Sequence, residues 1–429
     1  METLDPAARR SQLRRAIVAS TVGTSIEWYD FYLYGTAAAL VFPQKFFPAS
    51  DPFVGMLLSY STYFVGFVSR PLGAAIFGHY GDRLGRKVSL IATLILMGAA
   101  TAGIGLVPGY DQIGIWGAVL LTFGRLLQGI GVGGEWGGSV LLAAEWSDKK
   151  HRGFVTSFPH IGAPAGLVLA NGAFALASAY TTNEQFLDWG WRVPFLASVV
   201  LIAIGLYIRT GVKETPAFQK MRSEGQLSQA PVPEAVRAHW RPVLLVMFLR
   251  TSQQTAFFLF TNYILAYGTT ALGMARGTIL GYVSGAAVFS MFTVPFFGWL
   301  SDRVGRRRVT TIGCVIMLVF PFLWFGLLNT KEAGLVFLAI LLSMVVHDMQ
   351  YGPQAALIAE SFPSRVRYTG SSLGYQLASI TAGGPAPIVA LFLYQTFGSS
   401  TPIAFYLMIC SVISLVCVRL LPSGQYDEL

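Results

Sequence analysis

Charged residues are scarce in this sequence. Only 12% of its 429 residues are Asp, Glu, Lys or Arg, whereas soluble proteins contain about 25%. Cysteine is nearly absent as well, and the three that occur, Cys314, Cys410 and Cys417, do not have the spacing of metal ligands. We therefore expect small core residues at these positions, and neither a disulfide nor a metal site. The lack of charge excludes an ordinary soluble domain.

Apolar residues, at 54%, take the place of the missing charges. They form runs of roughly 20 residues, each long enough to cross a hydrocarbon core of about 30 Å as a helix. We predict an all-α membrane protein with twelve transmembrane helices. The expected spans are 16–40, 53–78, 88–107, 114–138, 153–178, 191–210, 241–266, 277–300, 309–328, 333–358, 369–396 and 402–420.

The longest polar interval lies between the sixth and seventh spans and divides the chain into two halves. The predicted organisation is a cytoplasmic N-terminus (1–15), an N-terminal six-helix half (16–210), a central cytoplasmic loop (211–240), a C-terminal six-helix half (241–421) and a short cytoplasmic tail (422–429).

The net charge of +9 is interpreted as a topology signal, and no nucleic-acid partner is expected. If the N-terminus is inside, the segments on that side carry 23 lysines and arginines and the opposite segments carry four. The positive-inside rule then puts both termini in the cytoplasm and the protein in the cell membrane. We expect a retained first span rather than a cleaved signal peptide, because the first apolar run is too long and Glu27 and Asp30 interrupt it.

Two loop motifs occur once in each half. GDRLGRK (81–87) and SDRVGRRR (301–308) follow spans two and eight, and AEWSDKKHRG (144–153) and AESFPSRVRYTG (359–370) follow spans four and ten. Such repetition indicates duplicated halves with a substrate site between them. Glycine permits a tight turn, and aspartate can pair with arginine or face a helix N-terminus. We expect gating or structural roles for Gly81, Asp82, Arg83, Gly85, Arg86, Asp302, Arg303, Gly305 and Arg306.

The spans and loops resemble the major facilitator superfamily. Five stretches together resemble its metabolite:proton symporter family, over about residues 15–420: EWYDFYLYG, RPLGAAIFGHYGDRLGRK, GRLLQGIGVGGEWGGS, WGWRVPFL and YGPQAALIAESFPSRVRYTGSSLGYQLAS. That family includes transporters of shikimate, α-ketoglutarate, citrate, and proline or betaine. The resemblance implies the major facilitator fold, proton-coupled uptake of a small metabolite, and a central cavity lined by spans one, four, seven and ten.

A few charged residues fall inside the predicted spans. A charge at the centre of a span costs about 2.5–3.5 kcal/mol on insertion scales, so such residues usually face a cavity or a partner. All but one of them lie on spans one, four, seven and ten. They are Glu27, Asp30, Arg70, Arg125, Glu135, Arg250 and Asp348.

Asp30 and Glu27 are the candidates for proton coupling, and they share one face of span one with Tyr34. A buried carboxylate near an arginine can bind and release a proton when its pairing changes. The alternative is a permanent ion pair that only locks two helices. We favour Asp30 slightly, because it lies nearer the middle of the span.

The interior arginines are candidates for binding a carboxylate, because the guanidinium group is a planar fork of donors. Arg125 can be such a ligand, the counter-ion of a span-one carboxylate (Glu27 or Asp30), or each at a different stage of the cycle. Asp348, next to His347, either titrates or pairs with Arg250. We expect a structural role for Arg70, near the first loop, and a structural or gating role for Glu135. The predicted substrate-binding residues are Arg125, Tyr34, Gln128, Arg250 and Asp348.

GIGVGG in span four has the spacing of a dinucleotide fingerprint, but the fingerprint requires a preceding strand. Gly129, Gly133 and Gly137 instead predict close helix packing. Pro159 and Pro164 in span five, and GGPAP (383–387) in span eleven, predict kinks at related positions.

The sequence therefore predicts a proton-coupled symporter of a small organic acid or zwitterion. The expected partners are this substrate, protons and the lipid bilayer, and we expect a functional monomer without a cofactor. No nucleophile motif suggests an enzyme. The alternatives are a proton-driven exporter and, less favoured because no soluble output domain is evident, a membrane sensor with a transporter fold.

Overall fold

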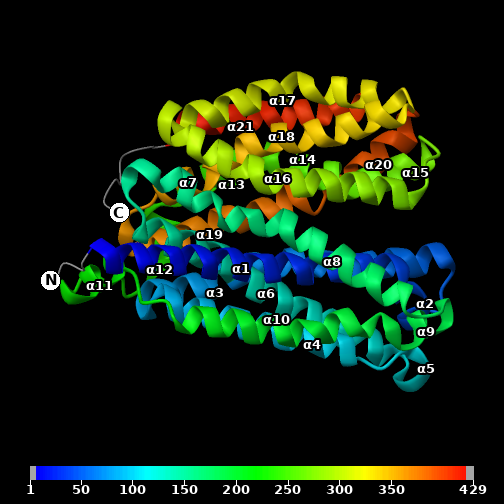
Figure 1. The fold of residues 1–429 in the computed structure, drawn as a ribbon, viewed down its shortest axis with the longest axis horizontal. Helices are drawn as coiled ribbons and strands as arrows, with labels where there is room; N and C mark the ends of the chain where they lie inside the picture. The colour runs from blue at the N-terminus through cyan, green and yellow to red at the C-terminus, as the bar shows by residue number, and fades with distance from the viewer. Residues whose placement is uncertain (1–5, 422–429) are drawn as a thin grey trace.

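The computed structural model describes residues 6–421, and these form helices and turns without a strand. Residues 1–5 and the predicted tail, 422–429, lie outside the described residues. Long helices run side by side in two bundles, one from each half of the chain (Figure 1). The described ends of the chain, residues 6 and 421, lie at the same end of the molecule, which we call the termini end.

The N-terminal bundle crosses the molecule six times. Its helices cover the expected spans and extend past several of them, so that the loop motifs continue as ordered helix ends. The long helices are α1 (Pro6–Leu40), α3 (Pro52–Leu84), α4 (Arg86–Leu106), α6 (Ile115–Trp146), α7 (Arg152–Ser157) with α8 (Gly162–Ala179), and α10 (Arg192–Thr210). The short connecting elements are α2 (Phe42–Phe46), α5 (Tyr110–Ile113), η1 (Lys149–His151), α9 (Asn183–Gln185) and the π-turn η3 (Phe186–Gly190).

The C-terminal bundle repeats this plan. Its helices are α13 (Trp240–Leu249), α14 (Thr251–Phe258), the π-turn η4 (Leu259–Tyr263), α15 (Ile264–Thr270), α16 (Arg276–Val304), α17 (Arg306–Asn329), α18 (Ala333–Ala359), η5 (Ser364–Val366), α19 (Arg367–Ala378), the π-turn η6 (Ser379–Gly383), α20 (Ala386–Phe397) and α21 (Thr401–Leu420). The seventh span is therefore one path built from α13, α14, η4 and α15.

The predicted kinks are confirmed in both halves. The 3₁₀ turn η2 (Pro159–Ile161) separates α7 from α8, and η6 with the following glycine-proline turn separates α19 from α20. Proline cannot donate the backbone hydrogen bond of a continuous helix, which explains both interruptions. Spans five and eleven are thus each divided into two segments.

The central loop forms two short helices at the termini end. They are α11 (Pro216–Ser223), capped by the Thr215 hydroxyl group at the amide of Phe218 (3.3 Å), and α12 (Pro231–Ala238). Helix α12 touches α3 of one half and α19 of the other. Glu234 on α12 forms a 3.0 Å ion pair with Arg365. The loop therefore lies across the boundary between the halves.

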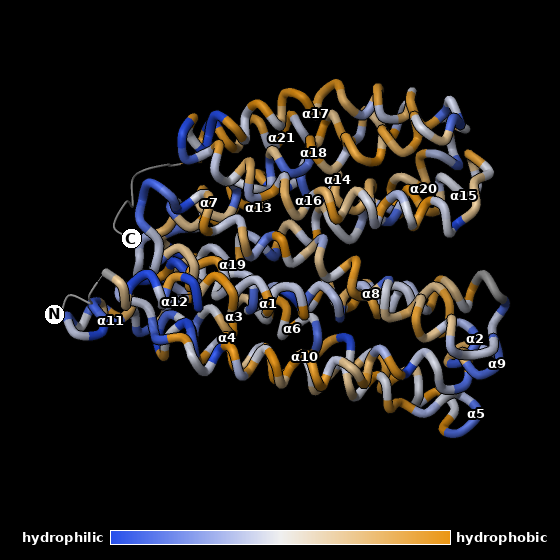
Figure 2. Tube along the Cα trace, viewed as in Figure 1, coloured by the Kyte–Doolittle hydropathy of each residue, from blue (hydrophilic) through white to orange (hydrophobic). Residues whose placement is uncertain are grey.

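The outer surface along the helices is apolar. Phe292, Val319 and Phe392 expose 71%, 69% and 65% of their area, which fits lipid contact rather than water. Hydrophilic segments gather at the two ends of the bundle in Figure 2. Ten helical segments of the described chain are long and apolar enough to cross a membrane, and α1 and α3 lie alongside them with charges in their interior. The chain is a multi-pass membrane protein.

Close packing of α6 on α3 is confirmed. A Cβ atom on Gly133 would lie 2.0 Å from the carbonyl oxygen of Arg70, and one on Gly129 would lie 2.3 Å from that of Gly66. Gly137 behaves differently, because a Cβ atom there would meet Ser372 of the other half, 2.0 Å away. Gly129 and Gly133 therefore allow close packing of α6 on α3 within one half, and Gly137 allows close packing of α6 on α19 of the other half.

Candidate functional site

Two aspartates join the halves at the termini end in the same way. Asp82, at the end of α3, accepts hydrogen bonds from the backbone amides of Tyr368 (3.3 Å) and Thr369 (2.9 Å) at the start of α19. Asp302, at the end of α16, accepts hydrogen bonds from the amides of Gly153 and Phe154 at the start of α7, both 2.8 Å. A carboxylate at a helix N-terminus is favourable because the free amides there carry partial positive charge.

Arginines of the same loops hold these aspartates in place. Arg86 lies 2.9 Å from Asp82, and Arg306 lies 3.1 Å from Asp302. The glycines before them, Gly85 and Gly305, have φ angles of +117° and +106°, which favour glycine. Each aspartate thus makes both of the contacts that the sequence suggested. Arg83 and Arg303 lie outside this network, next to His79 and on the Trp299 ring.

The second repeated motif contributes a glutamate on each side. Glu145 pairs with Arg86 at 3.3 Å, and Glu360 pairs with Arg306 at 2.9 Å. Glu360 also binds Arg152 of the other half at 2.9 Å. The loop motifs therefore form two ion-pair clusters, one around Arg86 and one around Arg306, and the second crosses the boundary through Arg152 and Glu360. Together we call them the ionic network.

Between this network and the middle of the bundle lies a cluster of four rings. Trp136 stacks on Tyr375, with ring centroids 3.6 Å apart, and His160 stacks on Tyr351 at 3.8 Å. Trp136 donates its indole N–H to Nε2 of His160 (3.0 Å), and Nδ1 of His160 donates to the carbonyl oxygen of Tyr351 (2.8 Å). Because the indole N–H is only a donor, His160 is neutral in this arrangement. Each stack joins one residue from either half.

Asp30 is buried in the N-terminal bundle and connects indirectly to Arg125. Thr101 on α4 donates to Oδ2 of Asp30 (2.7 Å) and accepts from Gln128 (2.7 Å), whose amide oxygen accepts from Arg125 (3.1 Å). The second oxygen of Asp30 has no hydrogen-bond partner within the described chain. The guanidinium group of Arg125 lies over the Tyr34 ring, 4.4 Å from its centroid. The two charges are thus linked through neutral groups without an ion pair.

Glu27 lies one turn away on α1 and has different neighbours. It is 4% exposed, and in the described part of the chain it accepts no hydrogen bond. Its charged surroundings are mixed, with Glu135 first, followed by Arg70 of α3 and Arg209 of α10. Arg70, for which a structural role near the first loop is predicted, lies on α3 about three helical turns from Asp82. It faces the middle of the bundle, over the rings of Phe31 and Phe67, each 4.8 Å away.

Arg250 is fully engaged within the C-terminal half. It donates to the side chains of Gln354 (3.1 Å), Gln253 (3.4 Å) and Gln254 and to the carbonyl oxygen of Tyr375. Its guanidinium group also lies 3.2 Å from the centroid of the Tyr375 ring. These contacts fix Arg250 beneath the ring cluster.

Asp348 does not pair with Arg250. Its Oδ1 is 2.8 Å from Nδ1 of His347, and its Oδ2 accepts from Ser290 (2.7 Å) and from Thr293. The amide of Gln253 lies 2.7 Å from Nε2 of the same histidine. Of the two arrangements that the sequence allowed, the structure contains the histidine pair.

Glu135 forms a buried ion pair with Arg209 on α10 and accepts hydrogen bonds from Thr93 (2.9 Å) and Ser139 (2.8 Å). Arg209 lies at the end of the sixth predicted span and is one of the 23 lysines and arginines predicted on the cytoplasmic side, but it is only 2% exposed. Its long side chain reaches back into the bundle. This arrangement agrees with the structural alternative for Glu135.

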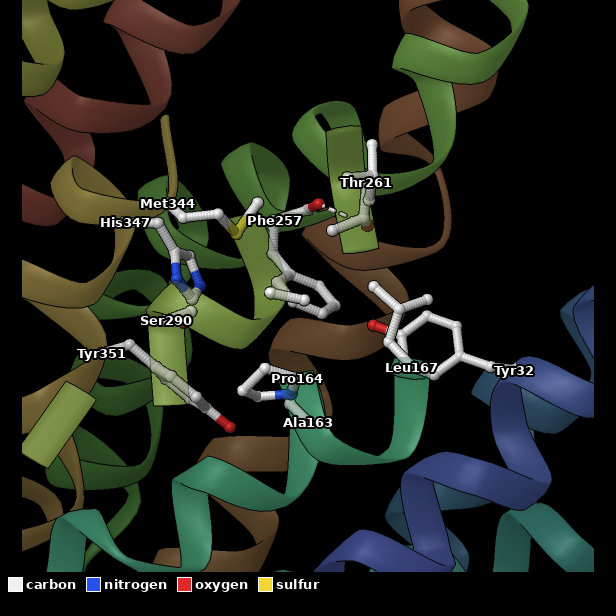
Figure 3. A pocket seen from close by; sticks show the side chains of 12 residues that line it. Tyr32, Ala163, Pro164, Leu167, Phe257, Thr261, Ser290, Met344, His347 and Tyr351 are labelled. Carbon is white, nitrogen blue, oxygen red and sulfur yellow. Dashed lines mark hydrogen bonds between the residues drawn. The ribbon is translucent and has the colours of Figure 1, made fainter. Parts of the chain in front are cut away.

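A small cavity lies between the halves at mid-depth. It is narrow and is lined mostly by apolar groups, with hydroxyl groups and one imidazole among them. Tyr32 and Tyr351 enter it from opposite sides in Figure 3, and Phe257 and His347 form another wall. The described residues contain no group of three or more His, Cys, Asp or Glu side chains that could hold a metal ion.

Several site residues gave no clear signal in the sequence. Thr101, Trp136, His160 and Tyr375 are single polar or aromatic residues in apolar runs, as are many others in this chain. Their importance follows from partners that are far away in the sequence. The two halves bring His160 and Tyr351 together across 191 positions.

Comparison with known proteins agrees with this architecture. The family model for the Major Facilitator Superfamily matches residues 21–385. The chain is 40% identical over 420 residues to the inner membrane metabolite transport protein YhjE of Escherichia coli, covering 97% of this chain and 95% of the relative. It is also 40% identical over 419 residues to the shikimate transporter of Escherichia coli, with 97% and 96% covered.

Among solved structures, the proton:xylose symporter XylE bound to 6-bromo-6-deoxy-D-glucose has a similar fold. The TM-score is 0.78 at 18% identity, with 97% of each chain covered. At this identity the likeness concerns the fold alone. The predicted twelve-helix architecture in two six-helix halves is confirmed.

Proposed function

The chain belongs to the major facilitator superfamily, and we propose that it carries a small organic acid or zwitterion into the cytoplasm together with a proton. It is a membrane transporter and not an enzyme. The relatives at 40% identity include a shikimate transporter, which supports a carboxylate-bearing substrate. The resemblance to the metabolite:proton symporter family is confirmed.

The observation that carries the proposal is the environment of Asp30. This carboxyl group is 2% exposed, receives one hydrogen bond and keeps one oxygen without a partner in the described chain. A buried carboxyl group that lacks a direct counter-ion is a natural proton acceptor. Of the two roles considered for Arg125, the chain of hydrogen bonds through Gln128 and Thr101 supports that of a counter-charge to Asp30.

Alternating access requires the halves to separate at one end and close at the other. The ionic network of Asp82, Asp302 and Glu360 joins the halves at the termini end, so this end is closed in the described state. The lysine and arginine distribution supports placing that end in the cytoplasm. Substrate and proton then enter from outside, and opening of the network releases them inside.

Transport into proteoliposomes tests this proposal. An inward proton gradient is expected to drive accumulation of one member of a panel of shikimate, α-ketoglutarate, citrate, proline and betaine. Asp30→Asn is expected to abolish accumulation while exchange of labelled for unlabelled substrate continues, because only the coupled proton is lost. Glu27→Gln is measured beside it to assign the proton to one carboxylate.

Two results would contradict the proposal. If Asp30→Asn and Glu27→Gln both keep full gradient-driven accumulation, neither carboxylate couples the proton. If the same gradient instead drives substrate out of the vesicles, the chain is a proton-driven exporter. That alternative uses the same fold and the same buried carboxylates.

A further inference from the structure

His347 and Asp348 form a buried pair on α18 at the edge of the cavity. Nδ1 of His347 lies 2.8 Å from Oδ1 of Asp348, and the two residues are 2% and 0% exposed. His347 shares one face of α18 with Met344 and Tyr351, and all three line the cavity between the halves (Figure 3). A titratable ring thus faces the cavity, with a carboxylate behind it.

Asp348 is surrounded by hydrogen-bond donors. Its Oδ2 accepts from Ser290 (2.7 Å) and from Thr293 of α16, and its Oδ1 accepts from Nδ1–H of His347. A carboxyl group that only accepts hydrogen bonds is best satisfied as a carboxylate. Within the described residues its one ion pair is with His347, whereas Asp82 pairs with an arginine. Because a buried charge without a counter-ion is costly, Asp348 favours a proton on the ring of His347.

Gln253 can bind the His347 ring both with and without a positive charge. Its amide nitrogen lies 2.7 Å from Nε2 of His347, and its amide oxygen accepts from Arg250 at 3.4 Å. When the ring is neutral, Nε2 accepts from the amide N–H. When the ring is charged, Nε2 donates, and the amide presents its oxygen after a turn of about 180°. Arg250 then loses the longest of its four hydrogen bonds.

His160 is a second buried histidine close by, and it lacks this freedom. Its ring stacks on Tyr351, with centroids 3.8 Å apart, and its Nε2 accepts from the indole N–H of Trp136. An indole nitrogen only donates, so a proton on this Nε2 would set two donors against each other. Of the two rings, His347 is therefore the one that can bind a proton without losing a partner.

Other titratable or charged groups approach the pair from the neighbouring elements. They are Arg250 at the start of α14, His160 of η2, Tyr32 of α1, Tyr375 of α19 and Cys314 of α17, together with Tyr351 of α18 itself. Of these groups, Arg250 carries a charge at neutral pH, and Gln253 separates it from His347. Asp348 touches His347 directly, so its attraction outweighs the repulsion by Arg250, because both weaken with distance.

We propose that His347 and Asp348 together bind a second proton, in addition to the one proposed for Asp30, and exchange it through the cavity. This inference rests on the proposed transport function. The proton binds Nε2 of His347 while the cavity is open to the outside, and it leaves when the termini end opens. Asp348 keeps its negative charge throughout, held by Ser290 and Thr293. Each substrate molecule then enters with two protons.

Nitrogen NMR of the purified full chain, labelled at its histidine rings, tests the site without a gradient. The signals of His347 are identified by their absence in His347→Gln. We expect this ring to be charged at about pH 5.5 and neutral at about pH 9, whereas His160 stays neutral at both. In Asp348→Asn, His347 is expected to be neutral at about pH 5.5 as well, because its counter-charge is gone.

The number of protons per substrate is measured in proteoliposomes, with the membrane potential clamped at zero. The readout is the opposing gradient of the labelled substrate, shikimate or another member of the panel that accumulates, at which net transport stops. A tenfold proton gradient balances about a hundredfold substrate gradient for two protons and about a tenfold one for a single proton. Wild type is expected to give two.

Removal of the site requires a double variant, because His347→Gln alone leaves Asp348 able to take the proton itself. His347→Gln with Asp348→Asn removes the proton acceptor and the buried charge together and is expected to give one proton per substrate. The matched control is His79→Gln, since His79 lies next to Arg83, outside the cavity. This control is expected to keep two.

Three results would overturn the inference. They are a His347 ring that stays in one state, neutral or charged, at both pH values, a wild-type chain that carries one proton, and a double variant that still carries two. If one proton drives uptake in both proteins, the proposed function stands and this inference fails. If His347 titrates as expected but no gradient drives uptake of any panel member, the proposed function fails and the proton site stands.

Discussion

Trp136 and Tyr375 stack face to face across the boundary between the two halves, with ring centroids 3.6 Å apart. Tyr375 also supports Arg250, whose guanidinium group lies 3.2 Å from the centroid of its ring. Tyr375 therefore contacts both Trp136 of the other half and the Arg250 guanidinium group near the centre of the bundle. In the proposed cycle this stack must separate whenever the termini end opens.

Removal of the Tyr375 ring is expected to destabilise the closed arrangement. Tyr375→Ala leaves a cavity under Trp136 and is expected to lower the free energy of unfolding by about 3 kcal/mol or more. Tyr375→Phe keeps both ring contacts and is expected to cost less than about 1.5 kcal/mol. Thermal unfolding in detergent measures both variants. Equal losses for Ala and Phe would show that the hydroxyl group, and not the stack, is what matters.

Neutralisation of the helix-capping aspartates is expected to open the termini end. Asp82→Asn and Asp302→Asn each weaken two hydrogen bonds to backbone amides, and bonds to charged groups contribute about 1.5–3 kcal/mol. The matched control is Arg303→Gln, since Arg303 lies outside the network, on Trp299.

Alkylation of a cysteine introduced at Ser89 measures this opening, because Ser89 is buried and lies 3.1 Å from the hydroxyl group of Tyr368 in the other half. Asp82→Asn is expected to raise the alkylation rate about tenfold, which corresponds to roughly 1.4 kcal/mol. The rate in Arg303→Gln is expected to stay near that of wild type. An unchanged rate in both aspartate variants would mean that these bonds do not hold the halves together.

Contact between α3 and α6 depends on the absence of one side chain. Gly133→Ala brings a methyl group 2.0 Å from the backbone of Arg70, where no side chain can move aside. We expect a loss of about 1–3 kcal/mol in the free energy of unfolding. Gly103→Ala on α4 meets nothing within 4 Å and is expected to be neutral or slightly stabilising. Equal melting temperatures for the two variants would contradict the packing argument.

The Glu135–Arg209 pair is expected to be a structural element. Arg209→Gln leaves a buried carboxylate without its charge partner and is expected to cost about 3–5 kcal/mol. Adding Glu135→Gln removes that charge and is expected to recover a measurable part of the loss. A loss in the double variant equal to the sum of the losses in Arg209→Gln and Glu135→Gln would show that the residues act independently.

Much of the fold follows from one-dimensional properties of the chain. An apolar run of about 20 residues indicates one membrane-spanning helix. The repetition of GDRLGRK as SDRVGRRR indicates that the two halves are duplicated. Each span was placed within a few residues, except that helix ends such as that of α6 extend past the apolar run as far as Trp146. Amphipathic ends remain helical because their polar side chains find partners in the loops.

Assignment of the interior charges was less successful. The sequence marks Arg70, Asp348 and Glu135 as interior charges, but the partner of each depends on helix rotation and on which helices are neighbours. The sequence places Arg70 near the first loop, and the structure adds that its guanidinium group lies over the Phe31 ring of α1. Asp348 was equally compatible with Arg250 and with His347, which is its neighbour in both sequence and space.

The sequence alone determined a membrane protein of two repeated six-helix halves with a small set of interior charges, because burial in lipid constrains composition residue by residue. The tertiary structure decided which of those charges are satisfied. Glu135, Arg250 and Asp348 have direct polar partners, whereas Arg70 and Glu27 make no hydrogen bond or ion pair within the described residues. Whether a buried charge has a partner depends on distances between side chains on helices that are far apart in the sequence. The spacing of residues along the chain does not specify those distances.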